Sequence, residues 1–465
     1  GFTLNTGPSA DTGTRDGGSH GGEGCDYSSD GNHTLTYGSI TNPQSLGSAG
    51  KEGTPAGGAM TIYSSGALLV NGVISANGTS SETAFGKGAG GSINITASTV
   101  SGSGIIRANG GTITGAVIGG AGGGGRIYVK LSSGSTFMQS IQAYGGDHLN
   151  TTTCKGAAGT VYLEDATDSS GSGMLIIDNN NISAPDETHT LVSSSVTNTT
   201  IGTLLLRNGA RMKVNEGSTL TTTNTGASME IQSGTWFSNY GTMTVRGTGA
   251  TVNGMFDSGT GSFITYIGNE DDDNVTLARG AHGTLTLNND STSFLLPSSI
   301  GNMNVLGDLN LTNGTLVTTN AQQITVSGSW LNTGGTFSGG TGTVMLISSD
   351  SSASITGNND FNNITIDDGL VGYWKFDDTA GSTTAADSSA RGNDGVLKNY
   401  DATQTQTGWV STGLSSFSFE NTGALDFDGA DDYIEMPNES DFDFDRTDPF
   451  AISIWMKSDQ VTTGM

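Results

Sequence analysis

Apolar residues alternate with polar ones in short runs through the first 367 residues. Clear examples are Ile93 and Ile95, then Ile127, Val129 and Leu131, then Val161 and Leu163. A period of two places one set of side chains on a buried face of a strand and the other set in water. Each run is bounded by Gly, Asn or Ser, which favour turns. No run of ten residues carries a helical apolar stripe, so we predict a protein of short strands with almost no helix.

A repeat of nearly constant length organises these strands. Glycines that precede successive strands, Gly58, Gly91, Gly125 and Gly159, are 33, 34 and 34 residues apart. A second landmark falls between them, as "ISANG" at 74–78, "IRANG" at 106–110 and "IQAYGG" at 141–146. Such self-similarity is typical of stacked rungs, since one rung cannot bury its apolar face alone. We therefore predict a parallel β-helix, or solenoid, over residues 56–367, with looser phasing beyond about residue 200.

Glycine is abundant, with 74 residues among 465. Turns between short strands need positive φ angles at their corners, which glycine adopts at low cost, and asparagine is the next most tolerant residue. "NG" at 71, 77, 109, 208 and 313 fits such corners. Residues 1–55 form a Gly-rich N-terminal segment, which we interpret, together with "GAVIGGAGGGG" at 115–125, as loose loops.

The pattern changes at residue 369. Large apolar residues now alternate, as in Trp374 and Phe376, Leu425 and Phe427, Ile434 and Met436, and the set Phe450, Ile452, Ile454 and Met456. Longer strands with large residues on one face are typical of an antiparallel sandwich. The sequence therefore predicts an all-β chain, with a parallel solenoid followed over residues 369–465 by part of an antiparallel jelly roll.

Three blocks in this last region resemble a known family. "GLVGYWKFDDTAGSTTAADSSARGNDGVL", "ALDFDGADDYIEMP" and "FAISIWMKS" are similar, in this order, to the opening blocks of laminin-G-like jelly rolls of the concanavalin A-like lectin/glucanase superfamily. Members usually have further strands after the third block, so we expect the sandwich to be incomplete in this chain. The earlier region is similar in texture to β-strand-repeat adhesins and other large bacterial surface proteins.

The laminin-G-like resemblance implies noncatalytic binding of carbohydrate or protein, often with calcium. Calcium takes six to eight oxygen ligands, and two acidic turns offer some of them. One candidate set is Asp428, Asp431 and Asp432, and the other is Asp387, Asn393 and Asp394. The alternative interpretation of both sets is solvated turn carboxylates.

The charge of the chain excludes nucleic acid as a partner. The chain has 44 acidic and 17 basic residues and a formal charge of −27, which repels nucleic acid and anionic lipid. No stretch approaches the roughly 20 apolar residues of a membrane span. Gly1 opens into ordinary sequence, so we expect a secretory leader either to have been removed or not to be included.

The chain has two cysteines, Cys25 and Cys154. They are too few for a disulfide scaffold and lack the paired spacing of a zinc site. We predict a single Cys25–Cys154 disulfide formed in an oxidising compartment, with two unlinked thiols as the alternative.

An enzyme is the rival hypothesis, because right-handed β-helices also carry polysaccharide lyases and hydrolases. Carboxylates and basic side chains occur together in "GNEDDDNVTLARGAHG", with Asp271, Asp272, Asp273, Arg279 and His282, and basic ones in "RNGARMKV", with Arg207, Arg211 and Lys213. The five histidines, His20, His33, His148, His189 and His282, lie in polar stretches without metal-ligand spacing, and we expect them to be solvated.

These observations favour a noncatalytic extracellular or cell-surface protein. We expect the solenoid to serve as a stalk or fibre segment and to present a laminin-G-like domain that binds a glycan or a surface protein. Unpaired strand edges would also allow self-assembly into fibres. A polysaccharide lyase or glycoside hydrolase is the alternative function.

Overall fold

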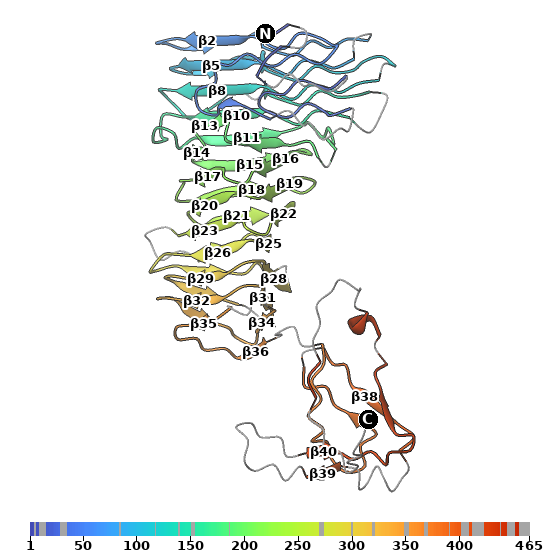
Figure 1. Ribbon diagram of the computed structural model, residues 1–465. Helices are drawn as coiled ribbons and strands as arrows, with labels where there is room; N and C mark the ends of the chain where they lie inside the picture. The colour runs from blue at the N-terminus through green and yellow to red at the C-terminus, as the bar shows by residue number, and fades with distance from the viewer. Residues whose placement is uncertain are drawn as a thin grey trace. The chain divides into compact units, whose positions relative to one another are not determined.

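Parallel strands stacked in register dominate the computed structural model (Figure 1). The chain divides into two units, residues 1–364 and residues 365–465. The structure describes residues 1–3, 6–8, 15–27, 35–82, 85–116, 118–137, 140–149, 154–185, 187–268, 274–298, 301–318, 321–347, 353–366, 371–389, 391–400, 409–411, 423–437, 439–443 and 452–454. Within these ranges the one helical element is a 3-10 turn, η1 (Glu439–Phe442), which confirms the predicted near absence of helix. No helix in the described part of the chain is long and apolar enough to cross a bilayer.

Twelve strands of the first unit form one continuous sheet, which we call the long wall. In order along the sheet they are β2 (Ala59–Tyr63), β5 (Ser92–Ala97), β8 (Arg126–Leu131), β10 (Thr160–Glu164), β11 (Met174–Asp178), β15 (Thr203–Arg207), β18 (Ala227–Ile231), β21 (Gly249–Val252), β24 (Asn274–Thr276), β27 (Ser293–Leu295), β30 (Thr315–Val317) and β33 (Thr336–Ser338).

The first coil of the solenoid, residues 59–164, contains the predicted repeat. Ala59 lies opposite Ser92, Ser92 opposite Arg126 and Arg126 opposite Thr160, in parallel register. These steps of 33, 34 and 34 residues confirm the spacing seen in the sequence. Two smaller sheets complete each rung, one of β3 (Leu68–Leu69) and β6 (Val100–Ser101), the other of β4 (Val73–Ser75), β7 (Ile105–Arg107) and β9 (Ile141–Gln142).

The second coil, residues 174–366, has three walls and shorter rungs. Residues in register on the long wall are 19 apart from Val275 to Phe294 and 27 apart from Gly249 to Thr276. The expected loosening of the repeat beyond residue 200 is therefore a change to shorter rungs. The rungs of the first coil are longer because each also contains glycine-rich residues outside the strands.

Two further walls close the second coil. We call the first the outer wall, and its strands are β12 (Thr190–Val192), β16 (Arg211–Val214), β19 (Trp236–Asn239) and β22 (Met255–Ser258), followed by a second sheet of β25 (Ala281–His282), β28 (Asn302–Val305), β31 (Gln323–Val326), β34 (Thr343–Leu346) and β36 (Asn363–Ile366). The third wall contains β14 (Thr200–Ile201), β17 (Thr219–Thr222), β20 (Thr242–Arg246), β23 (Phe263–Ile267), β26 (Thr284–Leu287), β29 (Leu309–Leu311), β32 (Trp330–Asn332) and β35 (Ile355–Thr356).

The two coils lie on opposite faces of the long wall. Ile127 and Val129 of β8 belong to the core of the first coil, whereas Tyr128 between them belongs to the core of the second. The chain also reverses at this place, since β10 and β11 are antiparallel while the pairs on either side are parallel. Because the strand direction and the buried face change together, both coils wind in the same sense.

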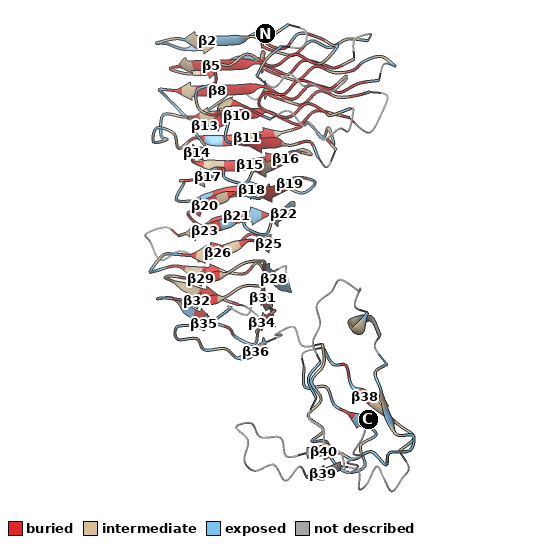
Figure 2. Ribbon diagram, viewed as in Figure 1, coloured by how far each residue is buried: buried red, intermediate tan, exposed pale blue. Residues whose placement is uncertain are grey.

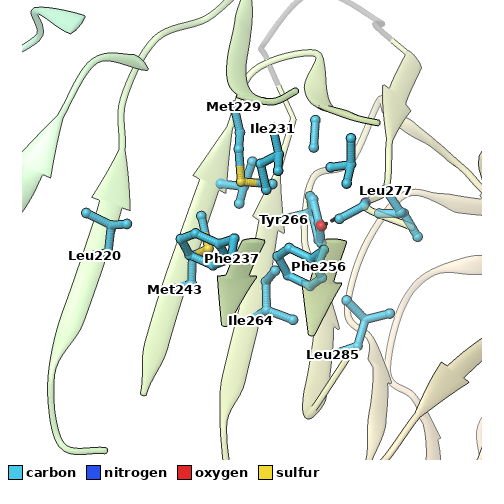
Figure 3. Close-up of a cluster of buried hydrophobic side chains, with 14 of the residues drawn as sticks. Leu220, Met229, Ile231, Phe237, Met243, Phe256, Ile264, Tyr266, Leu277 and Leu285 are labelled. Carbon is cyan, nitrogen blue, oxygen red and sulfur yellow. Dashed lines mark hydrogen bonds between the residues drawn. The ribbon is translucent and has the colours of Figure 1, made fainter. Parts of the chain in front are cut away.

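The core of the second coil is a continuous stack of inward side chains, part of which Figure 3 shows, and buried residues recur along its strands (Figure 2). Columns such as Leu220, Met243, Ile264 and Leu285 place one apolar residue above another in successive rungs. Each of these residues is fully buried, which contributes about 1.5–3 kcal/mol per large side chain. At the far end Trp330 packs edge-on against Phe361, with ring centroids 5.1 Å apart, so an aromatic cluster covers the last rungs.

Glycine-rich segments of the first coil form a second kind of core, which we call the glycine bundle. It comprises residues 15–25, 45–58, 76–80, 86–91, 108–111, 119–125, 143–146 and 154–159, which lie outside the named strands. Successive N–H groups of residues 120–125 donate to three neighbouring segments in turn. Residues 120 and 123 donate to the carbonyls of residues 15 and 18, and residues 121 and 124 donate to those of 154 and 157. Residues 122 and 125 donate to the carbonyls of residues 111 and 108. A period of three residues is that of a polyproline II helix, here surrounded by hydrogen-bonded neighbours.

Close packing of backbones explains the glycines of this bundle. A Cβ at Gly123 would lie 1.9 Å from the Gly22 carbonyl oxygen, and one at Gly125 would lie 2.1 Å from that of Gly91. Neither glycine has a positive φ, so its role is close approach and not a left-handed corner. The interpretation of residues 115–125 and of the N-terminal segment as loose loops is wrong where they enter the bundle, because the backbone there is buried and hydrogen bonded. Corner glycines do occur elsewhere, as at Gly209 and Gly314 after asparagine.

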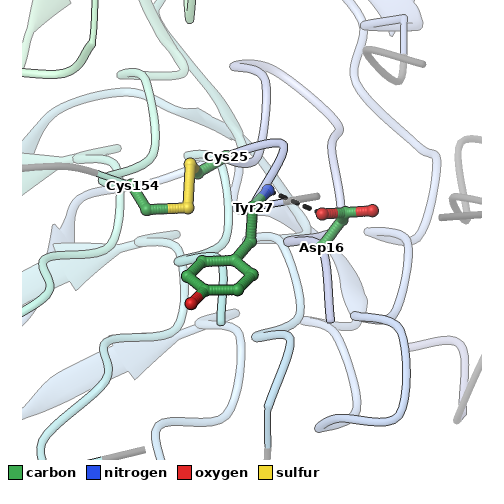
Figure 4. Close-up of a disulfide and its surroundings, with 4 residues drawn as sticks. All are labelled: Asp16, Cys25, Tyr27 and Cys154. Carbon is green, nitrogen blue, oxygen red and sulfur yellow. Dashed lines mark hydrogen bonds between the residues drawn. A yellow bond between two sulfur atoms is a disulfide. The ribbon is translucent and has the colours of Figure 1, made fainter. Parts of the chain in front are cut away.

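The N-terminal segment is threaded into this architecture. β1 (Gly38–Ser39) pairs with β13 (Val196–Thr197), and Ile40 is buried in the core of the second coil. Within the glycine bundle Cys25 is bonded to Cys154, with Cα atoms 5.0 Å apart and a sequence separation of 129 residues (Figure 4). The structure thus contains the cysteine pairing expected from the sequence.

The second unit, residues 365–465, has five described strands in two small antiparallel sheets. One contains β37 (Thr384–Ala385), β38 (Gly395–Lys398) and β41 (Tyr433–Glu435), and the other contains β39 (Trp409–Ser411) and β40 (Gly423–Leu425). Leu397 and Ile434 are opposite each other. Ile452 and Ile454, expected on the inner face of a sandwich, are 84% and 71% exposed, because no described strand covers them.

Candidate functional site on the outer wall

A groove follows the outer face of the outer wall. Along β19 the side chain of Phe237 points inward and stacks on Phe256 of β22 at a centroid distance of 5.5 Å, as Figure 3 shows. Trp236 and Ser238, its neighbours in sequence, therefore point outward. The groove has a volume of about 520 Å³ and is lined by Glu23, Leu35, Glu187, His189, Leu191, Arg211, Lys213, Asn215, Trp236, Ser238, Tyr240 and Asp257.

The register of the strands fixes how these side chains are arranged. Leu191, Lys213, Ser238 and Asp257 lie opposite one another on four successive strands and form the floor. Trp236 begins β19 and Tyr240 directly follows its last residue, so the two lie on either side of Ser238, with Cα atoms at most about 13 Å apart. Two aromatic side chains thus flank a floor of one apolar residue, Leu191, and three polar ones.

Each aromatic ring carries a cation. The Arg211 guanidinium lies 5.0 Å from the centre of the Trp236 ring, and the Lys213 ammonium lies 4.7 Å from that of Tyr240. Tyr240 also lies over Gly259, where a Cβ would be 2.4 Å from the ring. Such contacts are worth about 0.5–1 kcal/mol at exposed sites, and they hold both basic side chains in place within the groove.

The N-terminal segment supplies a buried carboxyl group at the β12 end of the groove. Glu23 is 4% exposed, and its Oε2 accepts a hydrogen bond of 2.7 Å from the His189 backbone N–H. The His189 Nδ1 atom is 3.8 Å from Oε2, too far for a hydrogen bond. Burial raises the pKa of Glu23 to about 8, against the opposing effects of the His189 N–H and of Lys213. This side chain is therefore mostly protonated and uncharged at neutral pH.

The three basic residues considered from the sequence for an enzyme site, Arg207, Arg211 and Lys213, do not all lie together. Arg211 and Lys213 line the groove, whereas the Nε atom of Arg207 donates to Asp178 at 2.7 Å on the long wall. In the other predicted cluster Arg279 is exposed and His282 is buried in the core, so they do not share a site. Asp271, Asp272 and Asp273 lie outside the described residues.

The expectation that the histidines are solvated is wrong for three of them. His20, His148 and His282 are buried, while His189 is partly exposed and His33 lies outside the described residues. Burial lowers the pKa of His20 to about 3 and that of His282 to about 4. Both are neutral at pH 7, and His282 stacks obliquely on Phe256 in the core at 5.5 Å.

The predicted calcium set of Asp387, Asn393 and Asp394 forms a hydrogen-bonded turn in the second unit. The two oxygens of Asp387 accept from the N–H groups of Tyr373, Ser389 and Asn393 and from the Ser389 hydroxyl, at 2.6–2.8 Å. Asp394 accepts from the Asp387 N–H at 2.8 Å. Burial by itself raises the pKa of Asp387, but these four hydrogen bonds lower it overall. The lone pairs of Asp387 are thus committed to holding the turn together.

The predicted set of Asp428, Asp431 and Asp432 is more exposed to solvent. Carboxylate oxygens of Asp428, Asp431 and Asp432 lie within 4.8 Å of one another. This spacing allows all three to lie at 2.3–2.6 Å from one calcium ion. Asp428 and Asp432 each also accept one backbone N–H, from Ala430 and Asp428 respectively, which fixes the turn. The residues present fit part of a calcium shell, and the remaining ligands would be backbone oxygens or water.

Comparison with known proteins gives no relative, since no family model, no curated protein and no solved structure matches this chain. The groove therefore has to be interpreted from its own chemistry. The sequence showed two of its residues, Arg211 and Lys213, but not Glu23, His189, Trp236, Tyr240 or Asp257. Alternation along β19 and into the next residue could have placed Trp236 and Tyr240 on one outward face. Nothing in the sequence links Glu23 to His189, 166 residues later.

Proposed function

We propose that this chain is an extracellular structural and adhesive protein that binds glycan through the groove of the outer wall. The observation that carries the proposal is the pair Trp236 and Tyr240 flanking a polar floor on a rigid sheet. Saccharides combine apolar ring faces with many hydroxyl groups, and aromatic side chains with nearby charged and amide groups match both. The stacked sheets provide a preorganised base, which reduces the entropy cost of binding.

The second unit is proposed as a laminin-G-like domain that binds a further glycan or protein ligand. Support comes from the three sequence blocks and from the antiparallel pairing of β38 with β41. Asp428, Asp431 and Asp432 would hold a calcium ion there, which would orient ligand oxygens. Self-assembly into fibres remains part of this proposal, as unpaired strand edges favour association.

Cleavage of the bound glycan is a second candidate function. A protonated carboxyl group at neutral pH, such as Glu23, is what a general acid for glycosidic bond cleavage requires. New reducing ends or unsaturated uronate products during incubation with polysaccharides would identify this activity.

A glycan array with and without calcium tests the proposal. We expect Trp236→Ala to weaken binding at least tenfold to the glycans that the wild-type protein retains, since stacking and hydrogen-bond geometry are lost together. Phe263→Ala is the matched control, because Phe263 is an exposed aromatic residue on the third wall, away from the groove. Signals that disappear in Asp431→Asn, or on chelation of calcium, belong to the second unit. Equal binding by wild type and Trp236→Ala would rule out the groove as a glycan site.

A further inference from the structure

Three of the four strands beneath the groove, β16, β19 and β22, present polar side chains in a row along the axis of the second coil, and β12 presents Leu191. Leu191, Lys213, Ser238 and Asp257 are in register on the adjacent strands β12, β16, β19 and β22. Adjacent strands are about 4.8 Å apart, so one side chain is offered per 4.8 Å of the axis. That spacing is comparable to the length of one sugar unit in an extended glycan.

The aromatic residues restrict the direction in which a long ligand can lie. A chain running along the strands would have to cross both Trp236 and Tyr240, which stand on either side of Ser238. A chain running along the axis passes between them and contacts Lys213, Ser238 and Asp257 in turn. The geometry therefore favours the axial direction.

Charge in the groove favours a ligand without charge. Arg211 and Lys213 are balanced by Glu187 and Asp257, and the protonated Glu23 adds none. The whole chain has a formal charge of −27, so a polyanion would be repelled on approach. Lys213 donates hydrogen bonds, Asp257 accepts them and Ser238 does both, which suits hydroxyl groups.

On this basis, and resting on the proposed glycan-binding function, we propose that the groove binds a linear, uncharged polysaccharide parallel to the solenoid axis, with one sugar over each of the four strands. Trp236 and Tyr240 form the side walls, and the floor residues contact the sugar hydroxyls. Residues of the N-terminal segment contact the end of the bound stretch nearest β12.

Oligosaccharides of defined length test this inference by isothermal titration calorimetry. The probes are β-1,4-linked glucose, mannose and xylose oligomers of two to six units, with hexagalacturonate as the acidic comparison. For at least one neutral series we expect Kd to tighten by roughly three- to tenfold per added sugar up to four units and then to level off. Binding should change little between low and high salt, because no net charge is neutralised.

A blocking variant checks the path of the chain. Ser238→Phe would fill the space between Trp236 and Tyr240 and should abolish binding of the tetramer. Thr244→Phe on the third wall is the matched control for an added outward aromatic ring, and circular dichroism of both variants checks the fold.

The outcomes separate this inference from the function on which it rests. If the affinity stops rising at the disaccharide, or if hexagalacturonate binds best and does so in a salt-dependent way, the groove does not bind a linear uncharged polysaccharide. A glycan site in the groove would still stand if Trp236→Ala weakened the binding. Binding of the tetramer by Ser238→Phe at wild-type strength overturns the axial path. Absence of binding to any of these probes and to the glycan array overturns both proposals.

Discussion

At the scale of the residue, several titratable side chains of this protein are buried. Glu23, His20 and His282 are all nearly inaccessible, and each has a pKa shifted toward its neutral form. Burial of a charge without a partner costs more than protonation of an acid or deprotonation of an imidazole. These residues consequently couple the stability of the solenoid to pH.

Glu23→Gln should change this pH dependence in a defined direction. Because the pKa of Glu23 rises from 4.5 in the unfolded chain to about 8 in the folded one, the folded state holds the extra proton between these values. The stabilisation is full below pH 4.5 and is lost as pH rises through about 8, by on the order of a few kcal/mol. In thermal unfolding at pH 5 to 9 we expect the variant to lose less stability than the wild type as pH rises.

His189 lies beside Glu23, with its Nδ1 atom 3.8 Å from the carboxyl group, so it needs its own control. His189→Gln should keep the wild-type slope above pH 7, because Glu23 is unchanged in that variant. Parallel curves for wild type and Glu23→Gln would show that the Glu23 carboxyl is not protonated in the native state.

At the scale of the element, the glycine bundle and the strands use the same backbone groups in different ways. Strands bond two neighbours with a period of two, whereas the bundle bonds three neighbours with a period of three. At glycines such as Gly123 the bundle leaves no space for a Cβ, so much of its stability comes from backbone hydrogen bonds in place of apolar burial. This explains how a chain with only 33% hydrophobic residues can still exclude water from a wide first coil.

Gly123→Ala tests this packing. The new Cβ would meet a backbone oxygen at 1.9 Å, which no side-chain rotation relieves, so we expect destabilisation by more than about 4 kcal/mol or failure to fold. Gly72→Ala is the matched control, since nothing lies within 4 Å of its Cβ position and its φ is not positive. That control should be neutral or slightly stabilising, by up to about 1 kcal/mol in denaturant unfolding. Equal stability of the two variants would mean that residues 119–125 are not closely packed.

At the scale of the whole molecule, the first unit consists of two coils that share one sheet, with an N-terminal segment threaded between distant rungs. Residues 15–25 bond segments near residues 87, 121, 157 and 189, so they can settle only when those rungs exist. The Cys25–Cys154 bond closes this arrangement covalently (Figure 4). Contacts between residues far apart in sequence slow folding, because long loops must close first. A covalent link across such a loop reduces the entropy that is lost on folding.

Removal of the disulfide should destabilise the first unit. In the chain-entropy model a loop of this length contributes about 4–5 kcal/mol, so Cys25→Ser with Cys154→Ser should show a clear fall in Tm. Addition of a reductant should lower the Tm of the wild type toward that of the double variant and should not affect the variant itself. If the disulfide is shown to be reduced and the Tm of the wild type does not fall, the bond does not stabilise the first unit in this way.

The sequence by itself determined the local character of this protein. Alternation at residues such as Ile93 and Ile95 is enough to predict strands, and the spacing of Gly58, Gly91, Gly125 and Gly159 is enough to predict stacked rungs, because both depend on neighbours in sequence or on a fixed repeat. Only the tertiary structure decided that Tyr128 and Ile127 serve different coils, that Gly123 packs against Gly22, and that Glu23 meets His189 beside Trp236. These contacts join segments far apart in the chain, and a pattern of polar and apolar residues states which side chains are buried without stating what they are buried against.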